Sequence, residues 1–293
     1  MFLRNLLKGT GVAIVTPFSA AGAIDFNALE KLIDFLINNG INYLVCLGTT
    51  GETPTLSKEE KREIVHFTYE KVNDRVPVVV GIGGNNTQAV IDDLNSFPLH
   101  KAAAILSVAP YYSKPSQEGL YQHYKAIAEA SPKPIILYNV PGRTGRNMEP
   151  ETTIRLAQLP NIAGIKEAGN NLVQGIKLLR DRPEDFLVVS GDDDLAMLQV
   201  ASGMDGVISV AANAFPKEFS QMIALAAQAN MTEAKKINEQ LVEAYELMFT
   251  ENNPAGVKAF LSEMGHIQNY LRLPLVPLSE GNAKKVKAYL SKK

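Results

Sequence analysis

Residues 134–168, PIILYNVPGRTGRNMEPETTIRLAQLPNIAGIKEA, contain the pattern from which the rest of the chain is built. Two short runs rich in apolar residues, at 134–140 and 162–168, stand about thirty residues apart, the usual span of a strand–helix–strand unit. Each run is continuous and does not alternate between apolar and polar residues. This is typical of a strand buried on both faces of a parallel sheet. The stretch therefore predicts two parallel strands joined by a crossover.

Similar runs recur along the whole chain, and most are followed by a segment with helical periodicity. The expected strands are 11–18, 43–48, 76–83, 102–110, 134–140, 162–168, 186–193 and 206–213. One helix face is predicted by the spacing of Leu29, Leu32, Ile33, Leu36 and Ile37. Ser57 and Glu60 form a capping box that predicts the start of the next helix, and Pro216 predicts a later helix start.

Eight strand–helix units predict an α/β fold, the (β/α)8 or TIM barrel, whose usual length is about 250 residues. A doubly wound open sheet is the alternative. Its dinucleotide fingerprint is missing from TPFSAAGAID (16–25), the segment after the first strand. Residues 1–229 are expected to form the barrel. Residues 230–293 are expected to form a C-terminal helical extension packed on the barrel, because no linker rich in Pro, Gly or Ser precedes them.

The composition is that of an ordinary globular protein. The chain has 293 residues, of which 46% are hydrophobic and 20% charged, with a net charge of −2. This balance predicts no nucleic-acid or membrane partner, and no apolar run reaches the roughly 18–20 residues that cross a bilayer. The first residues lack a secretory signal, so a cytoplasmic protein is expected. Cys46 lies in an apolar run and is expected to be a buried, unreactive thiol.

The carboxyl ends of the expected strands carry most of the polar groups of interest. In barrel enzymes these ends form the active site. The end segments are GTTGE (48–52), PYY (110–112), YNVPGRT (138–144), KE (166–167), SGDDD (190–194) and SVAAN (209–213). Hydroxyl groups, an arginine and a lysine are therefore expected around one mouth of the barrel.

Lys166 is unusual because a lysine is rarely placed in a buried strand. One interpretation is a side chain whose ammonium group extends to water at the barrel mouth. The other is catalytic: removal of water lowers a lysine pKa and leaves a neutral amine, which attacks a ketone to form a Schiff base. Tyr138, on the neighbouring strand at the same end, could carry the protons that imine formation requires.

The sequence predicts no metal site. The four histidines, His66, His100, His123 and His266, fall in helices or connections and show no ligand spacing. SGDDD could bind Mg²⁺ or cap the following helix, and a lone acidic turn does not separate these possibilities. GIGGNN (81–86) lacks the Lys-Ser/Thr of a phosphate-binding loop and is expected to form a turn.

Three motifs, GTTGE, YNVPGRT and GIKEA (164–168), occur in order at three strand ends, and with them the chain resembles the dihydrodipicolinate synthase and N-acetylneuraminate lyase family. The resemblance spans essentially the whole chain and implies a class I aldolase-like barrel. It implies that pyruvate condenses with L-aspartate-4-semialdehyde to 4-hydroxy-tetrahydrodipicolinate, in lysine and diaminopimelate biosynthesis. Lys166 would form the Schiff base with pyruvate, so no separate cofactor is expected.

The same resemblance implies the roles of the other site residues. The proton relay to and from the imine would consist of Thr49, Tyr138 and Tyr112. The substrate-binding groups would be Thr50 for the pyruvate carboxylate, Arg143 for the semialdehyde carboxylate and the Ile208 backbone beside pyruvate. In the family the tyrosine matching Tyr112 crosses a subunit interface. A homo-oligomer is therefore expected, at least a dimer and most often a tetramer.

Departures from the family pattern predict weak feedback by lysine. Lysine-inhibited members carry histidines and a glutamate at the positions that hold Lys58, Lys61 and Ala89 here, although Asn85 and Tyr111 are kept. Like charge and a missing carboxylate should weaken the binding of a cationic amino acid.

Two other functions remain open at this point. Sialic acid lyases and keto sugar acid aldolases of the same family are one alternative, although the arginine of YNVPGRT favours a short substrate that carries a carboxylate. A barrel that only senses a keto acid is the other, because a fold does not imply a reaction. A sensor, however, needs neither the amine of Lys166 nor the phenol of Tyr138.

Overall fold

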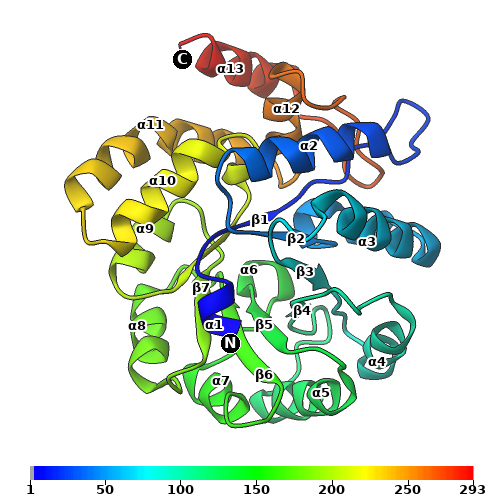
Figure 1. Ribbon diagram of the computed structural model, residues 1–293, viewed down its shortest axis with the longest axis vertical. Helices are drawn as coiled ribbons and strands as arrows, with labels where there is room; N and C mark the ends of the chain where they lie inside the picture. The colour runs from blue at the N-terminus through cyan, green and yellow to red at the C-terminus, as the bar shows by residue number, and fades with distance from the viewer. Residues whose placement is uncertain (1–2, 293) are drawn as a thin grey trace.

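The computed structural model describes residues 3–292 and contains a closed barrel of eight parallel strands (Figure 1). The strands are β1 Gly9–Ala13, β2 Tyr43–Cys46, β3 Val78–Gly81, β4 Ala104–Val108, β5 Ile135–Asn139, β6 Ile162–Glu167, β7 Leu187–Ser190 and β8 Gly206–Ser209. Each strand pairs with the next, and β8 pairs with β1 to close the barrel. The predicted (β/α)8 fold is confirmed. Each strand is shorter than the apolar run that predicted it.

One short helix, α1, precedes β1, and the helices that follow it connect the strands or lead out of β8. They are α1 Leu3–Leu6, α2 Phe26–Asn38, α3 Lys58–Val72, α4 Thr87–Ser96, α5 Gln117–Ala130, α6 Pro141–Thr144, α7 Pro150–Leu156, α8 Leu172–Asp181, α9 Ala196–Ala201 and α10 Pro216–Ala227. Both predicted helix starts are confirmed. Ser57 and Glu60 form the complete capping box of α3, and Pro216 occupies the first turn of α10, where its missing N–H costs nothing.

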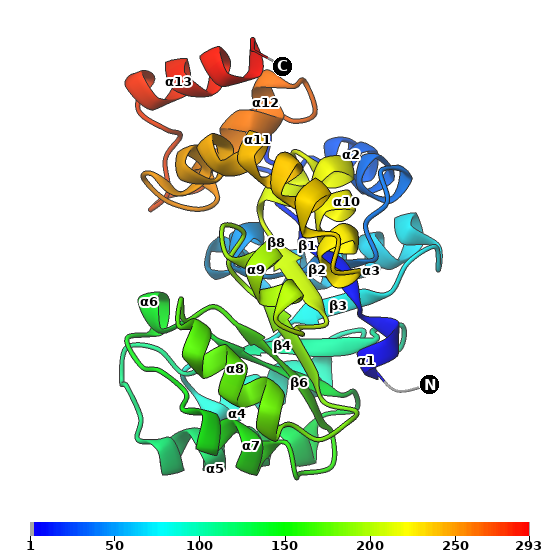
Figure 2. The ribbon, with the colours of Figure 1, turned by 90° about the vertical axis from the view of Figure 1, so that its left-hand side faces the viewer.

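Three helices follow the barrel: α11 Met231–Phe249, α12 Ala255–Glu263 and α13 Glu280–Leu290. Figures 1 and 2 show them gathered at one end of the molecule, with α11 packed along α10. Their presence agrees with a C-terminal extension, whereas the boundary between residues 229 and 230 stays a prediction.

The interior of the barrel is filled by side chains from alternate strand positions, and its widest group is the Tyr43 ring. Gly11 on β1 makes room for this ring, because a Cβ there would lie 2.1 Å from a Tyr43 ring carbon. The short helix α1, which the sequence did not predict, is held by an ion pair between Arg4 Nε and Asp205 Oδ1 at 2.8 Å. These groups close the amino end of the barrel.

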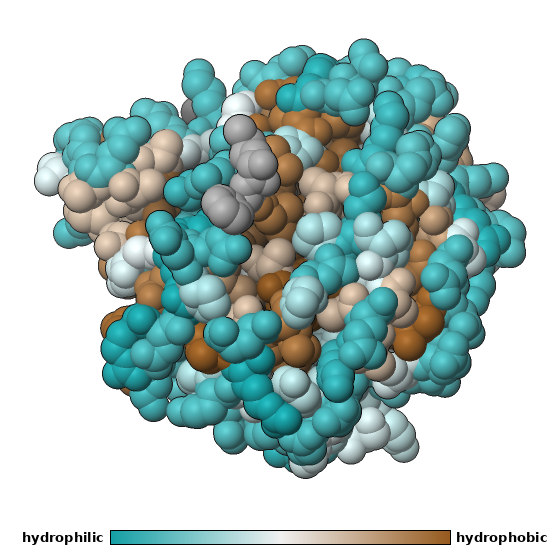
Figure 3. Space-filling model, turned by 60° about the horizontal axis from the view of Figure 1, so that its bottom comes forward, coloured by the Kyte–Doolittle hydropathy of each residue, from teal (hydrophilic) through white to brown (hydrophobic). Residues whose placement is uncertain are grey.

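Figure 3 shows one face, where apolar residues lie in separate patches between hydrophilic ones. Within residues 3–292 we find no helix that combines the length and the apolar character needed to cross a bilayer.

Candidate active site

A small cavity opens at the carboxyl ends of the strands and encloses about 70 Å³. Five of the seven predicted site residues line it: Thr49, Thr50, Tyr138, Arg143 and Lys166. They come from three segments that are far apart in the sequence, and the closed barrel brings these segments to one mouth. The other two, Tyr112 and Ile208, are not among its described lining residues.

Lys166 and Tyr138 form the centre of this cavity. They are directly paired across β5 and β6, so their side chains leave the sheet on the same face. Their exposed fractions are only 5% and 7%, and Lys166 Nζ lies 4.3 Å from the centroid of the Tyr138 ring. Lys166 forms no hydrogen bond or ion pair with any of residues 3–292. Its amine therefore does not extend to bulk water, and it points into the cavity.

Gly191, which follows β7, leaves the space that the lysine side chain occupies. A Cβ at this position would lie 2.8 Å from Lys166 Cε and 2.6 Å from the Cβ of Ala168. The Gly191 N–H also donates to the Glu167 carbonyl oxygen at 2.7 Å. The glycine of SGDDD is therefore a steric requirement of the site, which sequence analysis noted only as part of a strand end.

Glu167 follows Lys166 and points to the opposite face of β6, as alternation along a strand requires. Asn139 Nδ2 donates to both carboxylate oxygens at 3.0 Å, and Gln174 Nε2 donates to Oε2 at 3.0 Å. Burial raises the pKa of Glu167, and the amide hydrogen bonds oppose that rise. This buried network links the ends of β5 and β6 and fixes the spacing of the strands that carry Tyr138 and Lys166.

The two threonines of GTTGE lie on a short 3₁₀ helix, Thr49–Gly51, at the end of β2. The side chain of Thr50 is buried, and its Oγ1 accepts a hydrogen bond from Asn253 Nδ2 at 3.0 Å. Because a hydroxyl group both donates and accepts, its own hydrogen stays free to donate into the cavity. Asn253 also lines the cavity, and its buried Oδ1 has no hydrogen-bond partner among the described residues.

The C-terminal extension therefore contributes to the site. Phe249, at the end of α11, and Asn253, in the loop that follows, both line the cavity. Sequence analysis missed both residues because it treated this region as packing only. The one available signal was the polar stretch ENNP (251–254) between two helices.

A buried ion pair ties the GTTGE turn to the extension. Glu52 pairs with Lys258 of α12, and both side chains are 0% exposed. The second carboxylate oxygen, Oε2, accepts from the Arg272 N–H at 3.1 Å, and Lys258 Nζ donates to the Tyr270 carbonyl oxygen at 2.9 Å. Burial lowers the pKa of Lys258 to about 8, an effect that the Glu52 carboxylate opposes. The turn that carries the threonines is thus anchored by groups that water cannot reach.

The remaining predicted residues lie in different settings. Arg143 is exposed on α6 and lines the rim of the cavity. Ile208 is buried inside the barrel, and Val210, two residues later, lines the cavity. Tyr112 is 90% exposed and has φ of 70°, a left-handed conformation that is strained for an aromatic residue. Within one chain, Tyr112 therefore does not join the other site residues.

The acidic turn SGDDD has a different structure from the helix cap that was one expectation. Asp193 accepts from the Val210 and Ala211 N–H groups at 3.1 and 2.8 Å, and so holds the loop after β8. The residue that caps α9 is Leu195, which makes no side-chain hydrogen bond. Burial raises the pKa of Asp193 to about 6. No cluster of potential metal ligands occurs within residues 3–292, so the Mg²⁺ interpretation of this turn finds no support there.

Asp192 has a different position from its neighbour, because it lines the cavity. It is half-buried, and the Asn170 amide, in the orientation that satisfies both groups, donates to Oδ2 at 2.8 Å. Burial raises the pKa of Asp192 to about 7, and the nearby Asp194 carboxylate adds to the rise.

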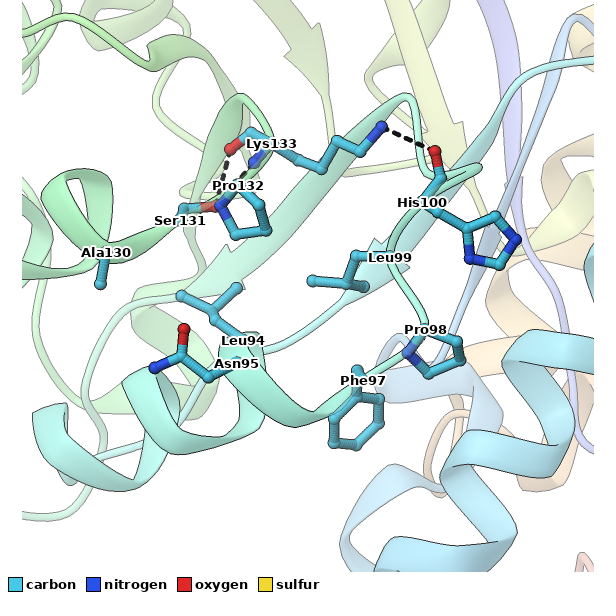
Figure 4. Close-up of a pocket in the computed structure, with 10 residues that line it drawn as sticks. All are labelled: Leu94, Asn95, Phe97, Pro98, Leu99, His100, Ala130, Ser131, Pro132 and Lys133. Atoms are coloured by element: carbon cyan, nitrogen blue, oxygen red, sulfur yellow. Dashed lines mark hydrogen bonds between the residues drawn. The ribbon is translucent and has the colours of Figure 1, made fainter.

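A larger, open hollow of about 480 Å³ lies at the surface beside the amino ends of β4 and β5 (Figure 4). It is formed by the segments that precede β4 and β5, among them Phe97, Leu99 and Lys133. Lys133 Nζ donates to the His100 carbonyl oxygen at 2.9 Å, and Ser131 Oγ donates to the Lys133 carbonyl oxygen at 2.7 Å. None of its described lining residues carries a buried polar group without a partner.

A (β/α)8 barrel that buries a lysine at the mouth of β6, next to a tyrosine, is typical of aldolase-like enzymes. The chain belongs to the dihydrodipicolinate synthetase family, whose model matches residues 6–293.

Relatives and solved structures agree with this assignment. A 4-hydroxy-tetrahydrodipicolinate synthase of Azobacteroides pseudotrichonymphae is 52% identical over 97% of this chain and 97% of its own length. A chloride-inhibited dihydrodipicolinate synthase of Acinetobacter baumannii, solved with pyruvate, is 43% identical, covers 97% of this chain and 98% of its own, and has a TM-score of 0.95. A structure described as a monomeric dihydrodipicolinate synthase variant is 41% identical, covers 99% of this chain and 97% of its own, and has a TM-score of 0.95.

The function predicted from the sequence, that of 4-hydroxy-tetrahydrodipicolinate synthase, is confirmed by these relatives. The alternative aldolases and lyases are not favoured. Lysine and diaminopimelate biosynthesis follows from membership in the family.

Proposed function

We propose that the synthase reaction of this chain proceeds through an imine between Lys166 Nζ and pyruvate. The observation that carries the proposal is the buried, hydrogen-bond-free amine of Lys166 beside the Tyr138 ring. A sensor for keto acids would gain nothing from burying such an amine. The relative that was solved with pyruvate supports the choice of the first substrate.

The first step is imine formation. Lys166 Nζ adds to C2 of pyruvate, the resulting hydroxyl group leaves as water, and the C2=N bond forms. This loss of water needs a proton donor. Tyr138 lies next to the amine, and Thr49 lines the same cavity, which supports both residues as members of the relay. No cofactor is required beyond the covalently bound pyruvate.

The second step forms the carbon–carbon bond. The imine withdraws electrons from pyruvate C3, which loses a proton to the relay and becomes an enamine. C3 then attacks the aldehyde carbon of L-aspartate-4-semialdehyde, whose oxygen takes up a proton. The amino nitrogen of the semialdehyde finally attacks C2 and displaces Lys166 Nζ, which closes the ring of 4-hydroxy-tetrahydrodipicolinate and restores the free amine.

The two carboxylates of the substrates need different partners. Thr50 is proposed to bind the pyruvate carboxylate. Its Oγ1 accepts a hydrogen bond from Asn253 Nδ2, which leaves the hydroxyl hydrogen free to donate to the carboxylate. The Ile208 backbone is proposed beside the same substrate. Arg143 at the rim is proposed for the semialdehyde carboxylate, since a guanidinium group binds a carboxylate through two parallel hydrogen bonds.

The active form is proposed to be a homo-oligomer in the cytoplasm, with Tyr112 entering the relay of a neighbouring subunit. Its 90% exposure and strained backbone favour a role outside its own chain. A second exposed apolar surface, made by Leu172, Val173 and Ile176, lies on α8. Two separate self-complementary surfaces are what a tetramer of dihedral symmetry requires.

The barrel, residues 1–229, and the extension, residues 230–293, are proposed to act as one functional unit. Asn253 and Phe249 complete a cavity whose other described lining residues belong to the barrel.

Trapping with borohydride tests the imine. Wild-type protein treated with pyruvate and borohydride should gain the mass of one reduced pyruvyl group on Lys166, and Lys166→Ala should gain none. Turnover is then measured with pyruvate and each of three second substrates: L-aspartate-4-semialdehyde, N-acetylmannosamine and glyceraldehyde. An unmodified wild-type protein would contradict the imine, and faster turnover of either sugar aldehyde would contradict the choice of second substrate.

A further inference from the structure

Residues 140–146 form a short loop that follows β5 and carries Arg143. Two members of the loop, Val140 and Arg143, line the cavity. Arg143 is exposed, so its side chain is not held by packing, and its reach depends on where the loop backbone lies. The contacts that fix this backbone therefore bear on the binding of the second substrate.

The two ends of the loop are joined by the buried amide group of Asn139, the last residue of β5. The Met148 N–H donates to Asn139 Oδ1 at 2.9 Å, and Asn139 Nδ2 donates to Asn147 Oδ1 at 2.8 Å. Asn147 is held in turn by Gln174, whose Oε1 accepts from Asn147 Nδ2 at 2.9 Å. The chain thus leaves β5 and returns to the same amide group, as in a compact closed loop.

Within the loop, the hydroxyl group of Thr144 connects the backbone on both sides of Arg143. The Thr144 side chain is buried, with an exposed fraction of 2%. Its Oγ1 lies 2.8 Å from the Arg146 carbonyl oxygen and 3.2 Å from that of Val140, and it accepts from the Arg146 N–H at 3.3 Å. The Val140 carbonyl oxygen also accepts from the Arg143 N–H at 2.9 Å. One buried hydroxyl group therefore ties together the segments that precede and follow the arginine.

We propose that Thr144 is a positioning residue that holds Arg143 in place for the second substrate, while Asn147 closes the neck of the same loop. The inference rests on the proposed function, because Thr144 would act through the carboxylate contact assigned to Arg143. A small displacement of a binding group is enough to weaken its contact. Pyruvate should be unaffected, because Lys166 lies on β6 and Thr50 on the GTTGE turn.

The test compares three threonine variants. Thr144→Val keeps the shape of the side chain without its hydroxyl group. It should raise the KM for L-aspartate-4-semialdehyde about three- to tenfold and leave the KM for pyruvate within about twofold. Thr144→Ser returns the hydroxyl group and should bring the semialdehyde KM back to within about twofold of wild type. Thr153→Val is the matched control, because Thr153 is equally buried and donates to the Glu149 carbonyl oxygen at 3.2 Å outside the loop, and it should change neither KM.

A double-mutant cycle decides whether Thr144 acts through Arg143. If it does, Thr144→Val should change the semialdehyde KM by less than about twofold in protein that already carries Arg143→Ala. An equal effect in both backgrounds would overturn the inference. An equal rise in the KM of both substrates, or no rise in either, would also overturn it, because a threonine that only satisfies local backbone groups does not distinguish one substrate from the other.

Two further measurements keep each outcome decisive. If circular dichroism shows that Thr144→Val does not fold, Asn147→Ala opens the neck of the same loop, and an unchanged semialdehyde KM in that variant would refute the inference. Borohydride trapping of pyruvate is run on every protein. A trapped adduct with an unchanged semialdehyde KM refutes only this inference, whereas a missing adduct in the wild type refutes the proposed function.

Discussion

The larger of the two hollows in this molecule is not the one that carries the reactive side chains. The open hollow beside the amino ends of β4 and β5 has a volume of about 480 Å³, and the cavity at the carboxyl end of the barrel only about 70 Å³. Yet the described lining of the larger hollow includes no buried polar atom without a partner, and its Lys133 Nζ donates to the His100 carbonyl oxygen. The smaller cavity contains the buried side chain of Lys166 next to the Tyr138 ring, together with the unpaired Oδ1 of Asn253. A buried amine beside a phenol ring, and not volume, marks the place where a substrate binds.

The difference has a structural cause. At the amino end, the Tyr43 ring fills the interior and the ion pair of α1 covers it, so little can be changed without loss of packing. At the carboxyl end, short turns present their side chains to one space and the extension closes it from the side. Buried polar groups there are kept in place by bonds outside the cavity, such as the network around Glu167.

The largest expected effect appears when kcat is compared between two lysine variants, one from each hollow. Lys166→Ala should lower kcat by at least about 10³-fold, because the covalent route is lost altogether. Lys133→Ala removes a lysine of the larger hollow that makes a single hydrogen bond, and should leave kcat within about twofold. Steady-state assays on both purified variants, with circular dichroism to check folding, make the comparison. A strong loss in Lys133→Ala would show that the amino end takes part in function.

The next effect concerns the anchor of the carboxyl end. Lys258→Met leaves the Glu52 carboxylate buried without its partner, and breaking such a pair from one side costs about 3–5 kcal/mol. Lys284→Met breaks an exposed pair with Glu280 and should cost at most about 0.5 kcal/mol. Urea unfolding monitored by circular dichroism gives both values. Similar stabilities of the two variants would mean that the GTTGE turn does not depend on this ion pair.

A smaller and more selective effect is expected at the rim. Arg143→Ala should reduce kcat/KM for L-aspartate-4-semialdehyde by about tenfold to a hundredfold, the value of a charge-assisted carboxylate contact. Trapping of pyruvate should be unchanged, because Arg143 is exposed on α6 and is proposed to bind only the second substrate. Unchanged semialdehyde kinetics would remove the main support for this binding role.

Much of this arrangement was predictable because local sequence patterns determine where the strands and helices form. Continuous apolar runs at regular spacing predicted the eight strands. Since parallel strands place their carboxyl ends at one mouth, the cluster of Lys166, Tyr138 and Thr50 followed from the fold. The short helix α1 was missed because four residues are too few to show a period.

The residues that the sequence did not reveal depend on contacts across the chain. Asn253 reaches Thr50 from 203 positions away, and no spacing rule indicates such a partner. Gly191 is explained only by the path of the Lys166 side chain. Asp192 lines the cavity, whereas its neighbour Asp193 accepts from the N–H groups after β8, a difference that only the direction of each side chain sets.

The smallest expected effect is on regulation. Lys58 is engaged with Asp93, its Nζ lying 3.0 Å from Oδ1, and Ala89 has no carboxylate to offer a cationic ligand. Free lysine should therefore inhibit weakly or not at all, since a like charge stands where a partner would be needed. Steady-state assays with lysine added up to high millimolar concentration measure this, with Ala89→Glu as the variant that returns one negative charge. Inhibition of the wild-type enzyme below one millimolar would contradict the prediction, and it would place a second functional site away from the barrel mouth.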